Sequence, residues 1–65
     1  MIELTVNAKA VHTAAATLDA LLGELNFEPP FATALNGVFV PRSHYEATEL
    51  NSGDAVDVVS PVGGG

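Results

Sequence analysis

Residues 32–42 read ATALNGVFVPR, and they contain the clearest structural signal in this sequence. Two short apolar runs flank the pair Asn36-Gly37. Such a pair predicts a tight type I′ hairpin, because both central residues of that turn need a positive φ. Pro41 has no amide hydrogen to give to a strand ladder, so it closes the second run. The first predicted element is therefore a hairpin centred on this pair.

Strand patterns also occupy the amino end of the chain. Apolar and polar residues alternate from Ile2 to Val6, which is the period of a half-buried strand. Residues 7–9 suit a turn, since asparagine tolerates the left-handed backbone that turns require. Residues 10–13 then predict a second, less hydrophobic strand, which we place at an edge of the sheet.

The carboxyl end supplies a further strand. Residues 51–54 read NSGD, which is a turn signal, and Val56, Val58 and Val59 follow it. The first and last strands are the most apolar, so we expect both at the centre of the sheet. If they pair in parallel, the chain between them forms the crossover, which should be right-handed.

One helix is predicted between these strands. Four leucines recur with the i, i+3, i+4, i+7 spacing of a single helical face: Leu18, Leu21, Leu22 and Leu25. Thr17 suits the N-cap, and Asp19 falls in the first turn, where the helix dipole favours an anion. Pro29 and Pro30 end the pattern. Residues 43–50 are too short and mixed for more than a single turn.

The order strand, strand, helix, strand, strand, strand predicts an α+β domain with one helix across one face of a sheet. We expect a β-grasp, or ubiquitin-like, fold with a mixed four- to five-stranded sheet. The domain should span residues 1–60, with a flexible glycine tail over residues 61–65.

Composition narrows the classes of partner. Eight acidic residues oppose only Lys9 and Arg42, which gives a net charge of −6. This charge repels nucleic acid and anionic membranes, so we expect neither as a partner. A partner attracted by the net charge would present a basic surface; alternatively, the charge serves solubility. The amino end has no basic signal-peptide region, so we expect a cytoplasmic protein.

The residues that usually perform catalysis are missing or scattered. The chain has no cysteine, and its two histidines, His12 and His44, lack neighbours with the spacing of metal ligands. Ser43 precedes His44 but has no nucleophile-elbow motif around it. We therefore expect no metal site and no enzymatic activity of the chain itself.

The carboxyl end, SPVGGG, offers another kind of chemistry. Glycines have no Cβ, so a terminal run of them can thread a narrow channel in a partner. From Pro61 the extended tail can carry the terminal carboxylate roughly 16 Å from the body. By itself a glycine terminus is weak evidence for such a role, and composition alone favours simple fraying.

The tail occurs together with a set of further motifs. They are the Asn-Gly hairpin, the VPR that follows it, the aromatic in SHY, the LNSGDAV turn into the last strand, and the TLDALLGEL helix. In this order and spacing, the sequence resembles the ThiS family of ubiquitin-like sulfur carriers over nearly the whole chain. It departs from the family in VNAKA, where an Asn-Gly turn is common, and in ending on three glycines instead of two.

The resemblance implies that Gly65 carries the chemistry and that Gly63 and Gly64 permit threading. A ThiF-type adenylyltransferase would convert the Gly65 carboxylate to an acyl-adenylate with ATP, and the carrier itself would bind no cofactor. A cysteine desulfurase or other donor would supply sulfur to form a thiocarboxylate. A ThiG-type thiazole synthase would then take the sulfur for thiamin biosynthesis.

For docking to partners we expect an apolar patch on the exposed sheet face, including Phe39 or Val58, with Arg42 as a further contact. Core packing of Phe39 and Val58 and a simple surface role for Arg42 are the alternatives. Three other functions stay open: the small molybdopterin-synthase subunit (MoaD), a protein-conjugating modifier, and a non-covalent interaction module.

Overall fold

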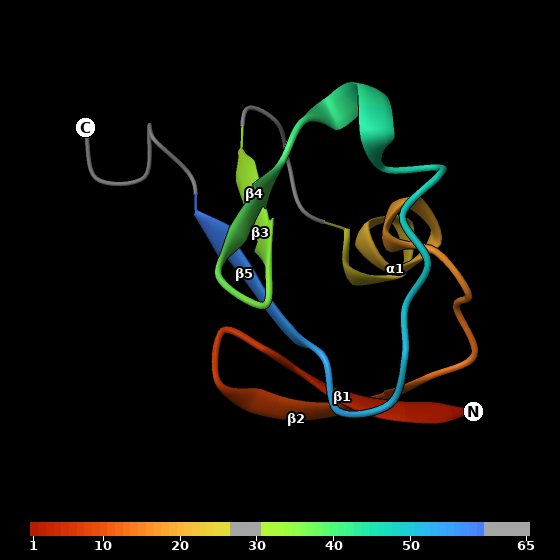
Figure 1. Cartoon of the computed structure of the whole chain (residues 1–65). Helices are drawn as coiled ribbons and strands as arrows, with labels where there is room; N and C mark the ends of the chain where they lie inside the picture. Colours follow the sequence, from red (N-terminus) through yellow and green to blue (C-terminus); the bar gives the residue numbers. More distant parts are fainter. Residues whose placement is uncertain (27–30, 60–65) are drawn as a thin grey trace.

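The computed structural model of the chain describes residues 1–26 and 31–59. Its elements are β1 (Ile2–Val6), β2 (Lys9–Thr13), α1 (Leu18–Leu25), β3 (Ala32–Leu35), β4 (Val38–Val40), the 3₁₀ turn η1 (Arg42–His44) and β5 (Ala55–Val59). The strands form one five-stranded sheet in the order β2-β1-β5-β3-β4, which curves around α1 (Figure 1). The predicted α+β architecture, with a mixed sheet and one helix, is confirmed.

The first and last strands pair in parallel at the centre of the sheet, as the sequence predicts. Thr5 lies opposite Ala55, and Val6 lies opposite Val56. On one side of this pair, β1 continues into the edge strand β2, and on the other side β5 pairs with the β3–β4 hairpin. The second strand begins at Lys9, one residue earlier than its hydrophobicity indicated.

Both hairpins turn through two residues of positive φ. Asn36 and Gly37 have φ values of 52° and 83°, as the predicted type I′ turn requires. Asn7 and Ala8 have φ values of 51° and 70°. The departure of this sequence from an Asn-Gly turn therefore leaves the geometry in place, but an alanine occupies the position that favours glycine.

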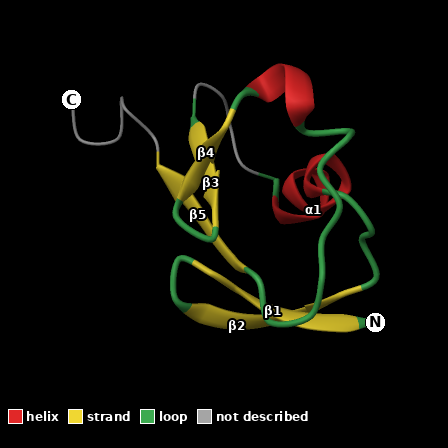
Figure 2. Cartoon of the chain, viewed as in Figure 1, coloured by secondary structure: helices red, strands yellow, loops and turns green. Residues whose placement is uncertain are grey.

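The helix begins where the sequence predicts. The Ala20 amide donates to the Thr17 hydroxyl at 3.3 Å, so Thr17 is the N-cap. The amides of Leu18 and Asp19 donate to the carbonyls of Thr48 at 2.9 Å and Tyr45 at 3.1 Å. The loop after η1, which runs past α1 in Figure 2, thus satisfies amides that a helix start leaves unpaired.

The helix ends at Asn26, whose φ of 56° places it in the left-handed region typical of helix C-caps. Pro29 and Pro30, which the sequence suggested as the stop signal, lie outside the described residues. A left-handed asparagine immediately after the last leucine therefore already ends the helix.

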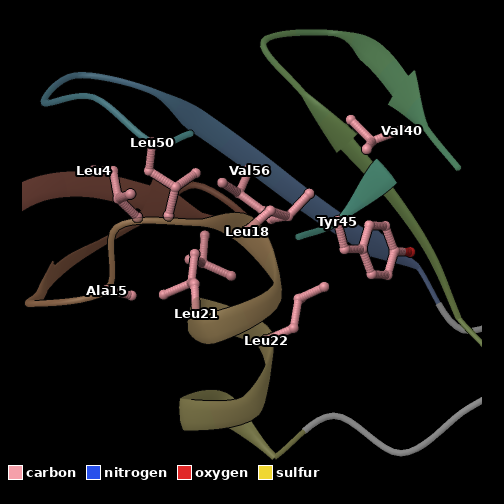
Figure 3. Close-up of a cluster of buried hydrophobic side chains, with 10 residues drawn as sticks. Leu4, Ala15, Leu18, Leu21, Leu22, Val40, Tyr45, Leu50 and Val56 are labelled. Atoms are coloured by element: carbon pink, nitrogen blue, oxygen red, sulfur yellow. The ribbon is translucent and has the colours of Figure 1, made fainter. Parts of the chain in front are cut away.

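The core lies between α1 and the sheet (Figure 3). Its buried apolar residues are Leu4, Val6, Ala15, Leu18, Leu21, Leu22, Val40, Tyr45, Leu50 and Val56. The three buried leucines of α1, Leu18, Leu21 and Leu22, belong to the predicted stripe, and the partly buried Leu25 packs against the same cluster. The leucine spacing therefore identified the core face of α1 correctly.

The buried polar groups in this core have hydrogen-bond partners. The Tyr45 hydroxyl donates to the Thr33 hydroxyl at 3.1 Å. The Thr13 hydroxyl donates to the Glu24 carboxylate at 2.7 Å and accepts from the Ala15 amide at 3.0 Å. Because an unpaired buried polar group costs about 1–3 kcal/mol, these bonds limit how α1 and η1 can sit on the sheet.

Ala8→Gly should stabilise the fold by about 1 kcal/mol, because it removes a Cβ from a left-handed backbone position. Ala8 is exposed, so the change removes no core contact. Urea unfolding followed by circular dichroism measures the difference.

Gly37→Ala is the matched control for this substitution. An added Cβ there would have no atom within 4 Å, so any cost comes from the backbone alone. We expect a loss of about 1 kcal/mol. A destabilised Ala8→Gly protein would contradict this account of the first turn.

Candidate functional site

The candidate site surrounds the carboxyl end of β5, from which the chain continues toward its terminus. Gly63, Gly64 and Gly65, together with the domain boundary expected at Pro61, lie outside the described residues. What the structure establishes is the position of the strand that leads to them. β5 is the central strand, with β1 on one side and β3 on the other.

An apolar patch lies on the sheet face that α1 leaves uncovered. Phe39 is paired with Ala34, and Ala32 is paired with Val59. Directly paired residues, and residues two apart on a strand, share a face, so these four side chains form one surface, on which the exposed Asp57, paired with Ala34, also lies. Phe39 is 65% exposed and Val59 is 62% exposed. We call Ala32, Ala34, Phe39 and Val59 the outer apolar patch.

Val58 does not belong to this patch. It is paired with Thr33, which is 1% exposed, and it packs partly buried against the core cluster. Phe39 and Val58 therefore lie on opposite faces of the sheet. For Val58 the structure shows core packing, which the sequence analysis gave as the alternative to a place in the exposed patch. Val59, one residue later, takes the exposed position. Alternation outward from a buried Val56 could have predicted this difference from the sequence.

Two asparagine side chains hold β5 from its two sides. The side-chain oxygen of Asn7 accepts a hydrogen bond from the backbone amide of Val58 at 2.8 Å. The backbone amide of Asn7 donates to the Val56 carbonyl, also at 2.8 Å. Asn36 accepts from the Ala55 amide at 2.9 Å and donates to the Asp54 carboxylate at 3.1 Å. Sequence reasoning assigned both asparagines to turns alone. In the structure they also fix the strand that carries the tail.

Arg42 lies near the same end of the sheet. It is the first residue of η1, one residue after Pro41, which follows β4. Because β4 and β5 both run antiparallel to β3, they run in the same direction and end on the same side. Arg42 is exposed, and within the described residues the close contact between a basic and an acidic side chain joins His12 and Glu3 instead.

The rest of the described surface offers little chemistry. His12 Nε2 lies 3.5 Å from Glu3 Oε2, but both side chains are more than half exposed, and His44 is exposed as well. Over residues 1–26 and 31–59 no three histidine, aspartate or glutamate side chains gather as a metal site would require. In the same residues, no helix has the length and apolarity needed to cross a membrane.

The fold and the position of the last strand define a β-grasp protein of the ubiquitin-like class. The ThiS family model matches residues 1–65, and this chain belongs to the ThiS family. These are small sulfur carriers of thiamin biosynthesis. The whole-chain match favours this family over the small molybdopterin-synthase subunit.

Solved structures support the assignment. The chain is similar to the crystal structure of a thiamine biosynthesis protein (ThiS) from Geobacter metallireducens, with 32% identity and a TM-score of 0.83. This match covers 98% of this chain and 100% of that one. A solution structure of a thiamine biosynthesis protein from the same organism matches with 32% identity and a TM-score of 0.79, over 98% and 88% of the two chains.

A much longer relative is also similar. A protein named thiazole synthase from Paramagnetospirillum magneticum is 39% identical over 54 residues. The match includes 82% of this chain but only 17% of that protein. The larger protein therefore contains one segment that resembles this chain.

Val58→Ala should destabilise the fold by about 1 kcal/mol, since it removes partly buried methyl groups. Phe39→Ala should change stability by less than about 0.5 kcal/mol, because an exposed side chain loses little on truncation. Urea unfolding of both variants tests the assigned faces. A larger loss for Phe39→Ala than for Val58→Ala would contradict them.

Proposed function

We propose that this chain carries sulfur for thiazole formation in thiamin biosynthesis, with the Gly65 carboxylate as the working group. The observation that carries the proposal is the ThiS family match over the whole chain, including the terminal glycines. The described part of the chain shows no cluster of metal-binding side chains. A sulfur carrier of the proposed kind acts as a co-substrate of other enzymes.

The proposed chemistry begins with activation. A carboxylate oxygen of Gly65 attacks the α-phosphorus of ATP in a ThiF-type adenylyltransferase, and pyrophosphate leaves. Sulfur from a cysteine desulfurase or another donor, released as hydrosulfide by a thiol reductant where it arrives as a persulfide, then attacks the acyl carbon and displaces AMP, which forms a C–S bond. The displacement of AMP by hydrosulfide itself needs no oxidant or reductant. The product is a thiocarboxylate at Gly65.

A ThiG-type thiazole synthase is the proposed acceptor of this sulfur. The relative from Paramagnetospirillum magneticum, named as a thiazole synthase, includes a segment similar to most of this chain. That relative joins a carrier-like segment and a protein named as a thiazole synthase in one polypeptide. This supports the view that a carrier and a thiazole synthase encoded as separate chains also work together.

The arrangement around β5 supports docking through the outer apolar patch. Val59 is the last described residue of the central strand, and it is paired with Ala32 beside Phe39 on the exposed face. A partner that receives residues beyond Val59 must approach this end of the sheet. Burial of an exposed phenylalanine against such a partner supplies apolar contact that the monomer lacks.

The proposal predicts a mass change. Incubation with ATP, the adenylyltransferase and sulfide should raise the intact mass by about 16 Da, because one oxygen is exchanged for sulfur. Electrospray mass spectrometry measures the shift. No shift with an active adenylyltransferase would contradict the carrier function, whereas a ladder of high-mass conjugates would favour a protein modifier.

A truncated chain provides the control for the tail. Deleting Gly64 and Gly65 should abolish the mass change but leave the unfolding midpoint unchanged. If truncation unfolded the domain, loss of activation would no longer assign the reaction to the terminus. Expression of the chain in a thiamin-auxotrophic strain and in a strain deficient in molybdenum cofactor tests which pathway uses the carrier. Rescue of the thiamin auxotroph alone is the expected result.

Phe39→Ala should raise the KM of the chain as a substrate of the adenylyltransferase about tenfold, as truncation of an interface anchor does. Val38→Ala is the matched control, because Val38 is 68% exposed but is paired with Leu35 and so lies on the other face. Pyrophosphate release measures both. Equal KM values for the two variants would exclude the patch as the docking surface.

A further inference from the structure

Asp57 places a carboxylate on the same surface as the outer apolar patch. It lies on the central strand β5, and its side chain is exposed. The register pairs it with Ala34, which is paired in turn with Phe39, and Val59 follows two residues later on β5. Paired residues and residues two apart on a strand share a face. The surface proposed for docking therefore has an acidic side chain among its apolar ones.

In the described part of the chain, Asp57 has no ion-pair partner. The close contact there between a basic and an acidic side chain joins His12 to Glu3. Lys9 is paired with the buried Val6, so it belongs to the opposite face of the sheet. The charge of Asp57 is therefore not neutralised by any of the described side chains.

The other described carboxylates have different surroundings. Asp54 accepts a hydrogen bond from the Asn36 side chain at 3.1 Å. Glu3 shares the outer face with Asp57, but it lies level with Gly53, whose amide donates to its carbonyl. Gly53 precedes Asp57 by four residues, which corresponds to about 13 Å along a strand. The remaining described carboxylates lie on α1 or in the loop after η1: Asp19, Glu24, Glu46 and Glu49.

A partner that covers the outer apolar patch also covers Asp57. Phe39 and Asp57 are two strand spacings apart, which is about 10 Å, and Val59 lies about 7 Å from Asp57 along β5. A protein interface of ordinary size buries about 800 Å² on each partner, which is a surface about 30 Å across. Contact with both Phe39 and Val59 therefore removes water from the Asp57 carboxylate.

The loss of this water determines what the partner has to supply. A carboxylate that is desolvated without a countercharge costs much of the free energy gained by apolar contact. A purely apolar partner surface would therefore bind this patch less tightly than a patch without the carboxylate. A basic side chain opposite Asp57 reverses the balance, because a charge-assisted hydrogen bond replaces the lost water. An arginine can bond both carboxylate oxygens at once.

Building on the proposed function, we infer that the adenylyltransferase places a basic side chain against Asp57, within an apolar contact around Phe39 and Val59. The apolar residues supply contact area, and Asp57 determines specificity. It favours a surface with a matching cation and disfavours an apolar surface that lacks one. The net charge of −6 left two meanings open, a basic partner surface or solubility. This inference assigns the first meaning to one side chain.

The test measures the Kd of Asp57 variants for the adenylyltransferase by isothermal titration calorimetry without ATP. Asp57→Asn removes the charge at nearly constant shape. It should raise the Kd about tenfold or more, because the partner's cation is left buried without a countercharge. Asp57→Leu should raise the Kd at least as much, although it enlarges the apolar patch. Asp57→Glu keeps the charge and should stay within about threefold of the wild type.

Glu49→Gln is the matched control, because it removes the same charge from an exposed position in the loop paired with Thr17 at the start of α1. It should leave the Kd unchanged. A lower Kd for Asp57→Leu would mean an apolar partner surface without a cation, since the cost of desolvating the carboxylate disappears. That result, an unchanged Kd for Asp57→Asn, or an equal rise for Glu49→Gln would overturn the inference. Urea unfolding of each variant establishes that folded proteins are compared.

Pyrophosphate release in the presence of ATP separates this inference from the proposed function. If the wild-type chain binds the enzyme but is never adenylated, the sulfur-carrier function fails, and the Kd values alone judge the role of Asp57. If it is adenylated and the Asp57 variants bind like the wild type, the function stands and the inference is wrong. Absence of both binding and adenylation would overturn both.

Discussion

The parallel pairing of β1 with β5 is the constraint on which the other features depend. It joins the two ends of the chain through Thr5–Ala55 and Val6–Val56, and the Asn7 side chain extends the contact to Val58. A parallel pair requires a crossover, and here nearly all of the intervening chain supplies it. α1 must then cover the face that contains Val56, which is completely buried. The same pairing places the strand leading to the terminus at the centre of the sheet.

This central position connects stability with the proposed chemistry. A carrier that delivers its own terminus needs a rigid origin for the tail, and β5 is held by strand pairing and by two asparagine side chains. The turns that contain these asparagines therefore support the strand that leads to the proposed working group. The outer apolar patch lies on the exposed face next to this origin. The proposed recognition surface thus lies next to the strand that leads to the proposed working group.

The limits of sequence-based prediction appear most clearly in β5. Three valines within four residues show that a hydrophobic strand is present, but a one-residue shift reverses which of them faces α1. Val58 and Phe39 consequently looked equivalent, although they lie on opposite faces. The loop after η1 was equally hard to interpret, because its carbonyls act through partners on α1 that lie far away in the sequence. Tyr45, whose hydroxyl reaches Thr33, acquires its role in the same way.

The sequence by itself determined the local elements: the Asn-Gly turn, the leucine face and Thr17 cap of the helix, and the alternating first strand. These depend on backbone preferences and on periods that a short window of residues contains. Its motifs also indicated the ThiS family, which the whole-chain match confirms. Only the tertiary structure decided which side chains share a surface. That Val59 joins Phe39 and that Asn7 holds Val58 both follow from strand order and register, which are set by pairing between distant segments.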